Sequence, residues 1–394
     1  MGDRARRPLS QTTGPVRTSG EDDLAALLKR AWEGPHPRGP DDLTHGFHSY
    51  PARTHPGVAA VLLEGLSDRR ALVLDPFCGA GTVLVESMVA DRRAFGIDLN
   101  PLALRIAEVR CDWRDEPARA RFAARVDRVA ERSTSRVRAR VDVRAPLPPE
   151  ETRWYAPHVL KELAGLREEI LDVDDDRDRR ALGMVFSAMV VKFSRQRADT
   201  AEEAAPKRLR KGLATEFFHR KGHELVRRWA SLDEAVPKPV ARPRLRLGDA
   251  RRPVRVLQRN LRVDLILTSP PYGGTYDYVR HHARRFAWLE MDPRELRRHE
   301  LGARRDLRGP DAARRWNAQL GTVLRGCAEV LAEHGRVALV MGDAQLGKRR
   351  IAAVEQLHRL APAAGLRVRA SASQPRPDFT GGPPREEHLV VLSR

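Results

Sequence analysis

Two short apolar runs in this chain are each followed at once by a string of turn-forming residues. The run 71–74 precedes Asp75-Pro-Phe-Cys-Gly-Ala-Gly-Thr82 (the glycine turn), and the run 263–267 precedes Thr268-Ser-Pro-Pro-Tyr272 (the proline turn). Short apolar runs bounded by turn residues are typical of buried strands. Ligands of an open α/β sheet bind outside the carboxyl ends of its strands, so we expect both turns to face one crevice.

The rest of the hydrophobic pattern predicts an α/β chain with a helical interruption. Further short segments, either mostly apolar or alternating between apolar and polar residues, predict strands at 93–98, 244–249, 335–341, 365–370 and 387–392. Residues 113–241 (the helical insert) separate two of these strands, and they are far more than a crossover connection needs. Apolar positions at helical spacing predict helices in the insert around 159–170, 182–193 and 217–229.

The glycine turn carries the residues expected of a nucleoside-binding site. Asp98 ends the next predicted strand, where a carboxylate can bind ribose hydroxyls. Gly79 and Gly81 have no third glycine partner, and Asp75 would repel a pyrophosphate, so a dinucleotide does not fit. S-adenosylmethionine, which has an amino group, a ribose and no phosphate, does fit. Asp249 ends a third strand and is expected to accept a hydrogen bond from the adenine amino group, unless it is an ordinary turn aspartate.

The proline turn is suited to holding an exocyclic amine of a nucleobase. Pro270 and Pro271 make the backbone rigid and remove two amide donors, which leaves carbonyl groups free to face a ligand. We expect Ser269 and the carbonyl of Pro270 to accept the protons of the amine. Tyr272 offers a flat ring on which a base swung out of its helix could stack. The alternative is a proline-rich strand exit with a core tyrosine.

Together the two turns resemble the motifs of the DNA amino-methyltransferases, which methylate adenine at N6 or cytosine at N4. Residues 44–53 also resemble the upstream segment that packs over the cofactor in that family, and the alternative for this segment is a packed aromatic loop. The resemblance implies cofactor contacts from the glycine turn and from this segment, including Phe47, Tyr50, Phe77 and Thr82. A serine before Pro-Pro-Tyr is commoner among the cytosine enzymes, so cytosine N4 is favoured over adenine N6.

The resemblance implies a seven-stranded, doubly wound (Rossmann-like) methyltransferase sheet. It covers residues 43–112 and 242–394, the two parts of a catalytic domain, while 1–42 would form an N-terminal arm with a first helix. The implied reaction is direct transfer of the methyl group to nitrogen, without a metal. Carbon-5 cytosine chemistry is disfavoured because the matching turn has no cysteine nucleophile. The three cysteines of the chain are too scattered for a metal site or a disulfide framework.

Charge favours a nucleic-acid partner. The net charge is +19 and the sequence pI is near 10.8, although the predominance of arginine could also reflect a coding bias or a solvated surface. We expect the helical insert to recognise DNA through Lys192, Arg195, Arg197 and the basic cluster 207–211. A structural lid or a dimerising surface is the alternative role for the insert.

The segment after the proline turn combines glycines with aromatic and basic groups. It could close over a flipped base or hold the opened strand, and the residues expected to do so are Tyr276, Tyr278, His281 and His282. Helix packing is the alternative for at least two of them. The histidines need not act as a general base, because the proton can leave after transfer from an already cationic amine.

The sequence also sets the broader expectations. The first 20 residues are polar and are expected to be disordered, and no run of about 18 apolar residues could span a membrane. We therefore expect a cytoplasmic protein. The alternatives to DNA methylation are an RNA base amino-methyltransferase and a non-catalytic DNA-binding module of the same fold. A restriction endonuclease is a candidate partner, whereas the target sequence and the oligomeric state cannot be predicted.

Overall fold

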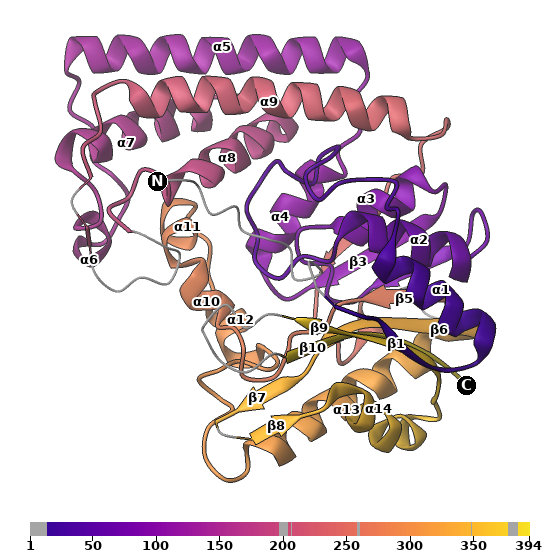
Figure 1. The fold of residues 1–394 in the computed structure, drawn as a ribbon. Coiled ribbons are helices and arrows are strands. Elements are labelled where there is room, and N and C mark those ends of the chain that lie inside the picture. Colours follow the sequence, from indigo (N-terminus) through magenta and orange to yellow (C-terminus); the bar gives the residue numbers. More distant parts are fainter. Residues whose placement is uncertain (1–13, 197–203, 206, 258–260, 348, 377–384) are drawn as a thin grey trace.

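The computed structural model describes residues 14–196, 204–205, 207–257, 261–347, 349–376 and 385–394. Its centre is an eight-stranded sheet with the order β1-β9-β10-β6-β5-β2-β3-β4 (Figure 1). The strands are β1 (Arg17–Gly20), β2 (Leu72–Asp75), β3 (Arg93–Asp98), β4 (Arg244–Leu247), β5 (Val263–Thr268), β6 (Leu331–Gly342), β9 (Arg367–Arg376) and β10 (Arg385–Ser393). Strands β2 to β6 pair in parallel, whereas β10 and β1 pair antiparallel with their neighbours.

Helices cover both faces of the sheet because successive apolar residues of a strand point to opposite sides. Val73 packs on one face against α1 (Asp22–Glu33) and α2 (Pro56–Leu66). Leu74 packs on the other face, in the cluster that contains α13 (Ala312–Val330) and α14 (Ala353–Leu360). Strand β2, at the middle of the site, is therefore buried on both sides.

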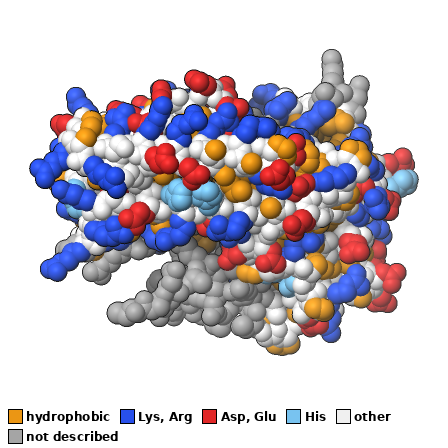
Figure 2. Space-filling view, turned by 90° about the horizontal axis from the view of Figure 1, so that it is seen from above, with side chains coloured by type: hydrophobic (Ala, Val, Ile, Leu, Met, Phe, Trp, Pro, Cys, Tyr) orange, Lys and Arg blue, Asp and Glu red, His pale blue; other side chains and the backbone are white. Residues whose placement is uncertain are grey.

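The helical insert forms a layer of its own beside the sheet. Its helices are α5 (Glu116–Ala139), α6 (Pro149–Thr152), α7 (Pro157–Leu171), α8 (Asp176–Val190) and α9 (Leu213–Ala235). The two longest, α5 and α9, lie side by side at the top of Figure 1, where the rings of Phe122 and Trp229 meet edge to face at 4.8 Å. On the face that they form, Lys and Arg side chains are interspersed with Asp and Glu (Figure 2).

The remaining elements are the helices that follow β2, β3 and the proline turn, two 3₁₀ turns, and two strands, β7 and β8, that pair antiparallel in a separate two-stranded sheet. They are α3 (Thr82–Val89), α4 (Pro101–Arg110), α10 (Tyr278–His281), α11 (Ala283–Trp288), α12 (Arg294–His299), β7 (Ala344–Leu346), β8 (Arg349–Ile351) and the 3₁₀ turns Pro253–Arg255 and Pro362–Ala364. Phe47 and Trp288 are fully buried in the same core as the insert helices. The insert therefore shares one core with segments that precede and follow the two turns.

All seven strands expected from the sequence lie in the sheet, and β1 is an eighth. The expectation of disorder up to Gly20 was wrong for residues 17–20, which pair antiparallel with β9. Each residue of β1 is exposed, so the strand has no apolar pattern to reveal it, and its stability comes from pairing. Gly20 has φ +104°, and a Cβ there would lie 2.1 Å from the carbonyl oxygen of Arg369. Within the described residues, no helix is both long and apolar enough to span a membrane.

Candidate active site

A pocket lies where the carboxyl ends of four parallel strands meet; its empty space, with open solvent at the mouth included, is about 640 Å³. Its lining comes from Pro76, Phe77 and Gly79 after β2, 98–100 at the end of β3, 248–250 after β4, and Ser269 and Pro271 after β5. Side chains from 44–53 and from the segment after the proline turn complete the lining, namely Tyr50, Ala52, Tyr278, Leu296, His299, Glu300 and Leu301. The structure thus brings both turns to one crevice, as the sequence predicts.

The glycine turn is tied to the carboxylate of Asp98. The backbone N–H of Gly79 donates to one oxygen of this carboxylate and the N–H of Asn100 to the other, each at 2.8 Å. Burial raises the pKa of Asp98 to about 6, although the backbone hydrogen bonds act to lower it. Gly79 (φ +49°) and Gly81 (φ +83°) adopt the left-handed conformation that favours glycine. Asp98 is therefore a positioned acceptor at the pocket wall.

Asp75 joins the glycine turn to the proline turn. Its Oδ1 accepts hydrogen bonds from the Thr268 hydroxyl at 2.6 Å and from the Phe77 N–H at 3.1 Å. Burial raises the pKa of Asp75 to about 7. Asp75 is not among the lining residues, and neither is Thr82, which is buried at the first position of α3. The structure therefore gives Asp75 a position between the turns and not on the pocket wall.

Within the proline turn, Ser269 and Pro271 line the pocket, whereas Pro270 and Tyr272 are buried away from it. The Tyr272 hydroxyl donates to the Glu387 carboxylate at 2.6 Å, and its ring lies against Gly342. Burial raises the pKa of Glu387 to about 7 and that of Tyr272 well above its ordinary value. Glu387 was missed by the sequence analysis, because it lies in a charged stretch at the start of an otherwise apolar strand, far along the chain from Tyr272.

Tyr50 and Tyr278 form an aromatic wall of the pocket. The Tyr50 ring is stacked with the Tyr278 ring at 6.0 Å and with the His282 ring at 5.1 Å. The side-chain N–H of Asn100, another residue that the sequence did not single out, donates to the Tyr50 hydroxyl at 3.3 Å. Phe47 lies elsewhere, fully buried in the core of the insert. Of the upstream segment's two predicted contacts, Tyr50 therefore reaches the pocket and Phe47 does not.

Asp249 lines the pocket but is engaged by a neighbour. The Arg251 guanidinium donates to both of its carboxylate oxygens, at 2.6 to 2.9 Å. Burial acts to raise the pKa of Asp249, but the hydrogen bonds from Arg251 outweigh it and lower the pKa below its ordinary value. A hydrogen bond from an adenine amino group would have to share this carboxylate with Arg251.

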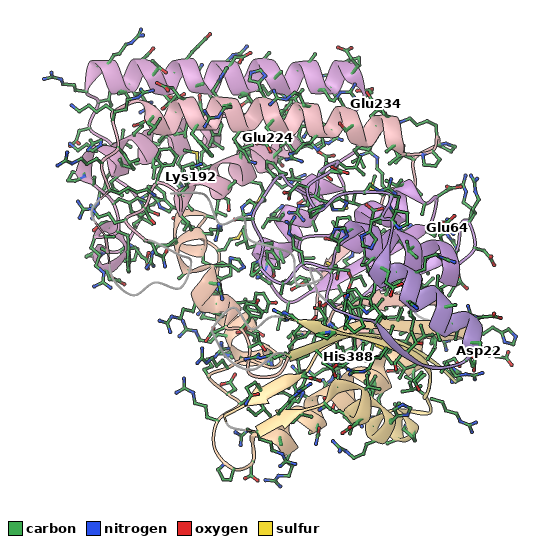
Figure 3. All side chains as sticks on the ribbon, in the orientation of Figure 1. Asp22, Glu64, Lys192, Glu224, Glu234 and His388 are labelled. Atoms are coloured by element: carbon green, nitrogen blue, oxygen red, sulfur yellow. The ribbon has the colours of Figure 1, made fainter. Side chains whose placement is uncertain are left out.

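The other residues predicted to bind nucleic acid do not gather in one place. Tyr276 and His281 lie beside the aromatic wall, with the ring of Tyr276 at 5.7 Å from that of Tyr278 and 5.5 Å from that of His281. Lys192 lies on the helical insert (Figure 3), is exposed, and has its ammonium 4.4 Å from the Phe217 ring.

Arg195 is held in the insert as well, where its backbone N–H donates to the Trp154 carbonyl at 2.6 Å. Arg197 lies outside the residues that the structure describes. In the basic cluster 207–211 the two lysines and two arginines are exposed, and Arg210 is paired with Glu216. These cations form a second group on the insert, separate from the residues of the pocket lining.

The family match covers the part of the chain that holds the glycine turn. Residues 8–109 match the DNA methylase family N6_N4_Mtase. The Type II methyltransferase M.MvaI of Kocuria varians is 37% identical over 65 residues, which are 16% of this chain and 14% of that protein. M.MjaII of Methanocaldococcus jannaschii is 35% identical over 66 residues, 17% of this chain and 12% of its own. The matches thus span only a small part of these curated relatives.

Similarity to solved structures is weaker. The rRNA methyltransferase aviRa from Streptomyces viridochromogenes is 14% identical with a TM-score of 0.36, covering 93% of this chain and 96% of its own. TrmN from Thermus thermophilus is 15% identical with a TM-score of 0.32, covering 86% and 49%. The sequence match bears out the predicted enzyme class for its segment, a DNA methyltransferase with S-adenosylmethionine as cofactor.

The chemistry of the pocket fits this cofactor. The lining includes the acids Asp98, Asp249 and Glu300, and among the described residues it includes no Lys or Arg. These acids would repel a phosphate-bearing ligand, whereas they stabilise a ligand with an ammonium and a sulfonium group. The residues that would hold it are Asp98, Gly79, Phe77 and Tyr50.

Proposed function

We propose that this protein is an S-adenosylmethionine-dependent methyltransferase that methylates an exocyclic amine of a base in DNA, with cytosine N4 favoured over adenine N6. The observation that carries the proposal is the meeting of the two turns in one pocket, with Asp98 and Gly79 on one wall and Ser269 on another. The parallel order β6-β5-β2-β3-β4 supports a Rossmann-like methyltransferase sheet, and the match of 8–109 supports DNA as substrate.

Binding comes first in the proposed mechanism. Asp98 accepts hydrogen bonds from the ribose, and the acidic lining favours the cationic end of the ligand. The Asp75 to Thr268 hydrogen bond fixes the distance between the two turns, which keeps donor and acceptor groups aligned. S-adenosylmethionine supplies an activated methyl group when bound.

The proline turn then orients the amine. The Ser269 hydroxyl and the Pro270 carbonyl accept its protons, which draws the nitrogen towards tetrahedral geometry and turns its lone pair to the methyl group. The methylated amine carries a positive charge and loses its proton afterwards, so this step needs no strong base. Stacking of the base on Tyr272 requires this ring to leave Gly342, against which it lies. Tyr50 and Tyr278 already present rings to the pocket, where the base would enter.

DNA binding is assigned to the helical insert and to the segment after the proline turn. Lys192, Arg195, Arg197 and the basic cluster 207–211 would contact phosphates, while Tyr276, Tyr278, His281 and His282 would contact the opened strand. Because the curated relatives are Type II methyltransferases, a restriction endonuclease with the same target is the proposed partner.

A base-resolved modification map of host DNA tests the function. Cells that express the protein are compared with cells that express Ser269→Ala, and Ser19→Ala on the exposed strand β1 serves as the matched control. We expect methylated bases at one recurring short sequence, lost in Ser269→Ala and kept in Ser19→Ala. The modified base distinguishes cytosine from adenine. Unchanged DNA from a folded protein that binds the cofactor contradicts the proposal, and methylated RNA in the same cells would identify the alternative substrate.

A further inference from the structure

We propose that Asp127, His219 and His223 form a binding site for a divalent transition metal, zinc above all, that joins α5 to α9. The Nε2 atoms of both histidines lie 2.7 Å from the same oxygen, Oδ1 of Asp127. The three ligating atoms all lie within 4.8 Å of one another. Three side chains from two helices thus converge on one point at the surface of the helical insert. None of them lines the pocket, so the metal site does not depend on the proposed function.

The backbone arrangement holds these ligands in place before any ion binds. His219 and His223 are four residues apart on α9, which puts both on one face of the helix. The two helices approach each other closely at Gly222 and Val126, which are adjacent in sequence to His223 and Asp127. A Cβ at position 222 would lie only 2.5 Å from Val126 Cγ1. The ligands therefore sit on rigid helices beside a tight contact.

The donor set is one that zinc accepts. Two imidazole nitrogens and a carboxylate oxygen are the three protein ligands of many zinc sites, with water in a fourth position. The three side chains are 31% to 47% exposed, so water can reach that position. Histidine side chains gather on the face of α5 and α9 seen in Figure 2. In the present geometry the shared Asp127 oxygen occupies the space between the two nitrogens, and a bound cation would replace the two protons of these hydrogen bonds.

Nearby cations are directed elsewhere. Lys221 and Arg228 both pair with Glu224, and the Arg220 guanidinium lies over the Phe217 ring at 5.1 Å. None of the three forms an ion pair with Asp127 among the contacts of the described residues. The carboxylate therefore keeps its charge for the histidines or for a metal ion.

A second cluster in the described part of the chain lacks this freedom. Asp343 accepts from the His388 ring at 3.0 Å and the Ala353 N–H at 2.9 Å, and its other oxygen binds Arg350 at 2.7 Å. His388 lies on the sheet (Figure 3), and the Arg350 guanidinium beside it already supplies the positive charge that a metal ion would bring. Only the cluster between α5 and α9 carries the proposal.

Calorimetric titration of the metal-free full chain, prepared without a histidine tag, with zinc chloride tests the site. We expect one equivalent of zinc per chain, and a loss of affinity of about tenfold or more in His223→Ala and in Asp127→Asn. His334 is exposed and lies far from the cluster in sequence, so the His334→Ala variant should bind zinc with the affinity of the wild type. Circular dichroism establishes that each variant is folded.

Thermal unfolding supplies a second readout. Zinc that binds only the native chain should raise its Tm, and the double variant His219→Ala, His223→Ala should show no such rise. The proposal is overturned if the wild type gives no saturable binding, or if the folded double variant binds zinc with unchanged affinity.

Discussion

Glu387 holds the buried tyrosine of the proline turn, Tyr272, through a hydrogen bond. One carboxylate oxygen accepts the Tyr272 hydroxyl, and the other is buried without a hydrogen-bond partner among the described residues. A fully buried carboxylate with one donor is poorly compensated for its lost hydration, which is why its pKa is raised to about 7. The protonated acid is thus the form that the fold favours.

Glu387→Gln should stabilise the protein relative to the wild type increasingly as the pH rises. Because the folded pKa is above the unfolded value of 4.5, the native wild type holds a proton that the unfolded chain has lost between pH 4.5 and about 7. Stability from this group is therefore lost across that window, by up to about 1.4 kcal/mol per pH unit. Urea unfolding at several pH values measures the difference, and a difference that does not change with pH contradicts it.

Asp98→Asn should weaken binding of S-adenosylmethionine and disturb the glycine turn. Both oxygens of Asp98 accept backbone N–H groups, whereas an amide offers one oxygen and would set its own N–H against a donor. Loss of a hydrogen bond to a charged group costs about 1.5 to 3 kcal/mol, or roughly 10- to 100-fold in affinity.

Calorimetry with the cofactor measures the effect of Asp98→Asn, with Asp68→Asn on the exposed surface as the control. Equal affinities of Asp98→Asn and the wild type would show that the carboxylate is not a cofactor ligand.

At the scale of elements, the insert is held together by close packing of α5 on α9. Gly222 lies at the contact, where a methyl group would meet Val126. By contrast, the position that a Cβ would take at Gly183 in α8 has no atom within 4 Å apart from those of its chain neighbours and its own helix backbone. The two glycines have opposite roles, although both are helical and neither is marked by the sequence pattern.

Gly222→Ala should destabilise the chain by about 1 to 3 kcal/mol, because the core is overpacked and the helices must separate. Gly183→Ala should stabilise it by about 0.5 to 1 kcal/mol, since alanine loses less backbone freedom in a helix. Guanidinium unfolding of the two variants checks both signs. If the two variants change stability in the same direction, the packing account of α5 and α9 is wrong.

At the scale of the whole molecule, α11 belongs to the core of the insert although it follows the proline turn in sequence. The Trp288 ring meets Tyr155 at 5.6 Å and Phe186 at 5.5 Å, both from the insert region. One core thus contains residues that lie, along the chain, before and after the strands that end in the two turns.

Trp288→Ala should cost about 3 to 5 kcal/mol and loosen the insert together with α10 to α12. Native-state hydrogen exchange should rise in α7 and α8 as well as in α11 itself. Trp316→Ala, a buried tryptophan of α13 on the face of the sheet away from the insert core, is the matched control and should leave α7 and α8 protected. Faster exchange restricted to α11 in Trp288→Ala would mean that the shared core is not cooperative.

Much of this arrangement follows from local patterns in the sequence, and the remainder depends on distant pairing. The strands that end in the two turns are mostly apolar runs, and Asp98 and Ser269 lie at the ends of such strands, so both were predicted in the pocket. The exposed strand β1 and the acid Glu387 have no such signal. Their partners, Ala370 and Tyr272, are far away in the sequence and become neighbours only in the sheet. For Phe47 the local pattern was misleading. Its aromatic segment predicted a contact with the cofactor, but the Phe47 side chain is buried in the core of the insert.

On the proposal that the helical insert recognises the target, the shared core also determines how a new target specificity could be engineered. A chimera that exchanges only residues 113–241 would remove Tyr155 and Phe186, the packing partners of Trp288. The side chains of the new insert would then not be complementary to α11. The exchangeable module is therefore discontinuous: it consists of the insert together with the segment from Tyr278 to Trp288, transplanted as a pair from the same donor enzyme.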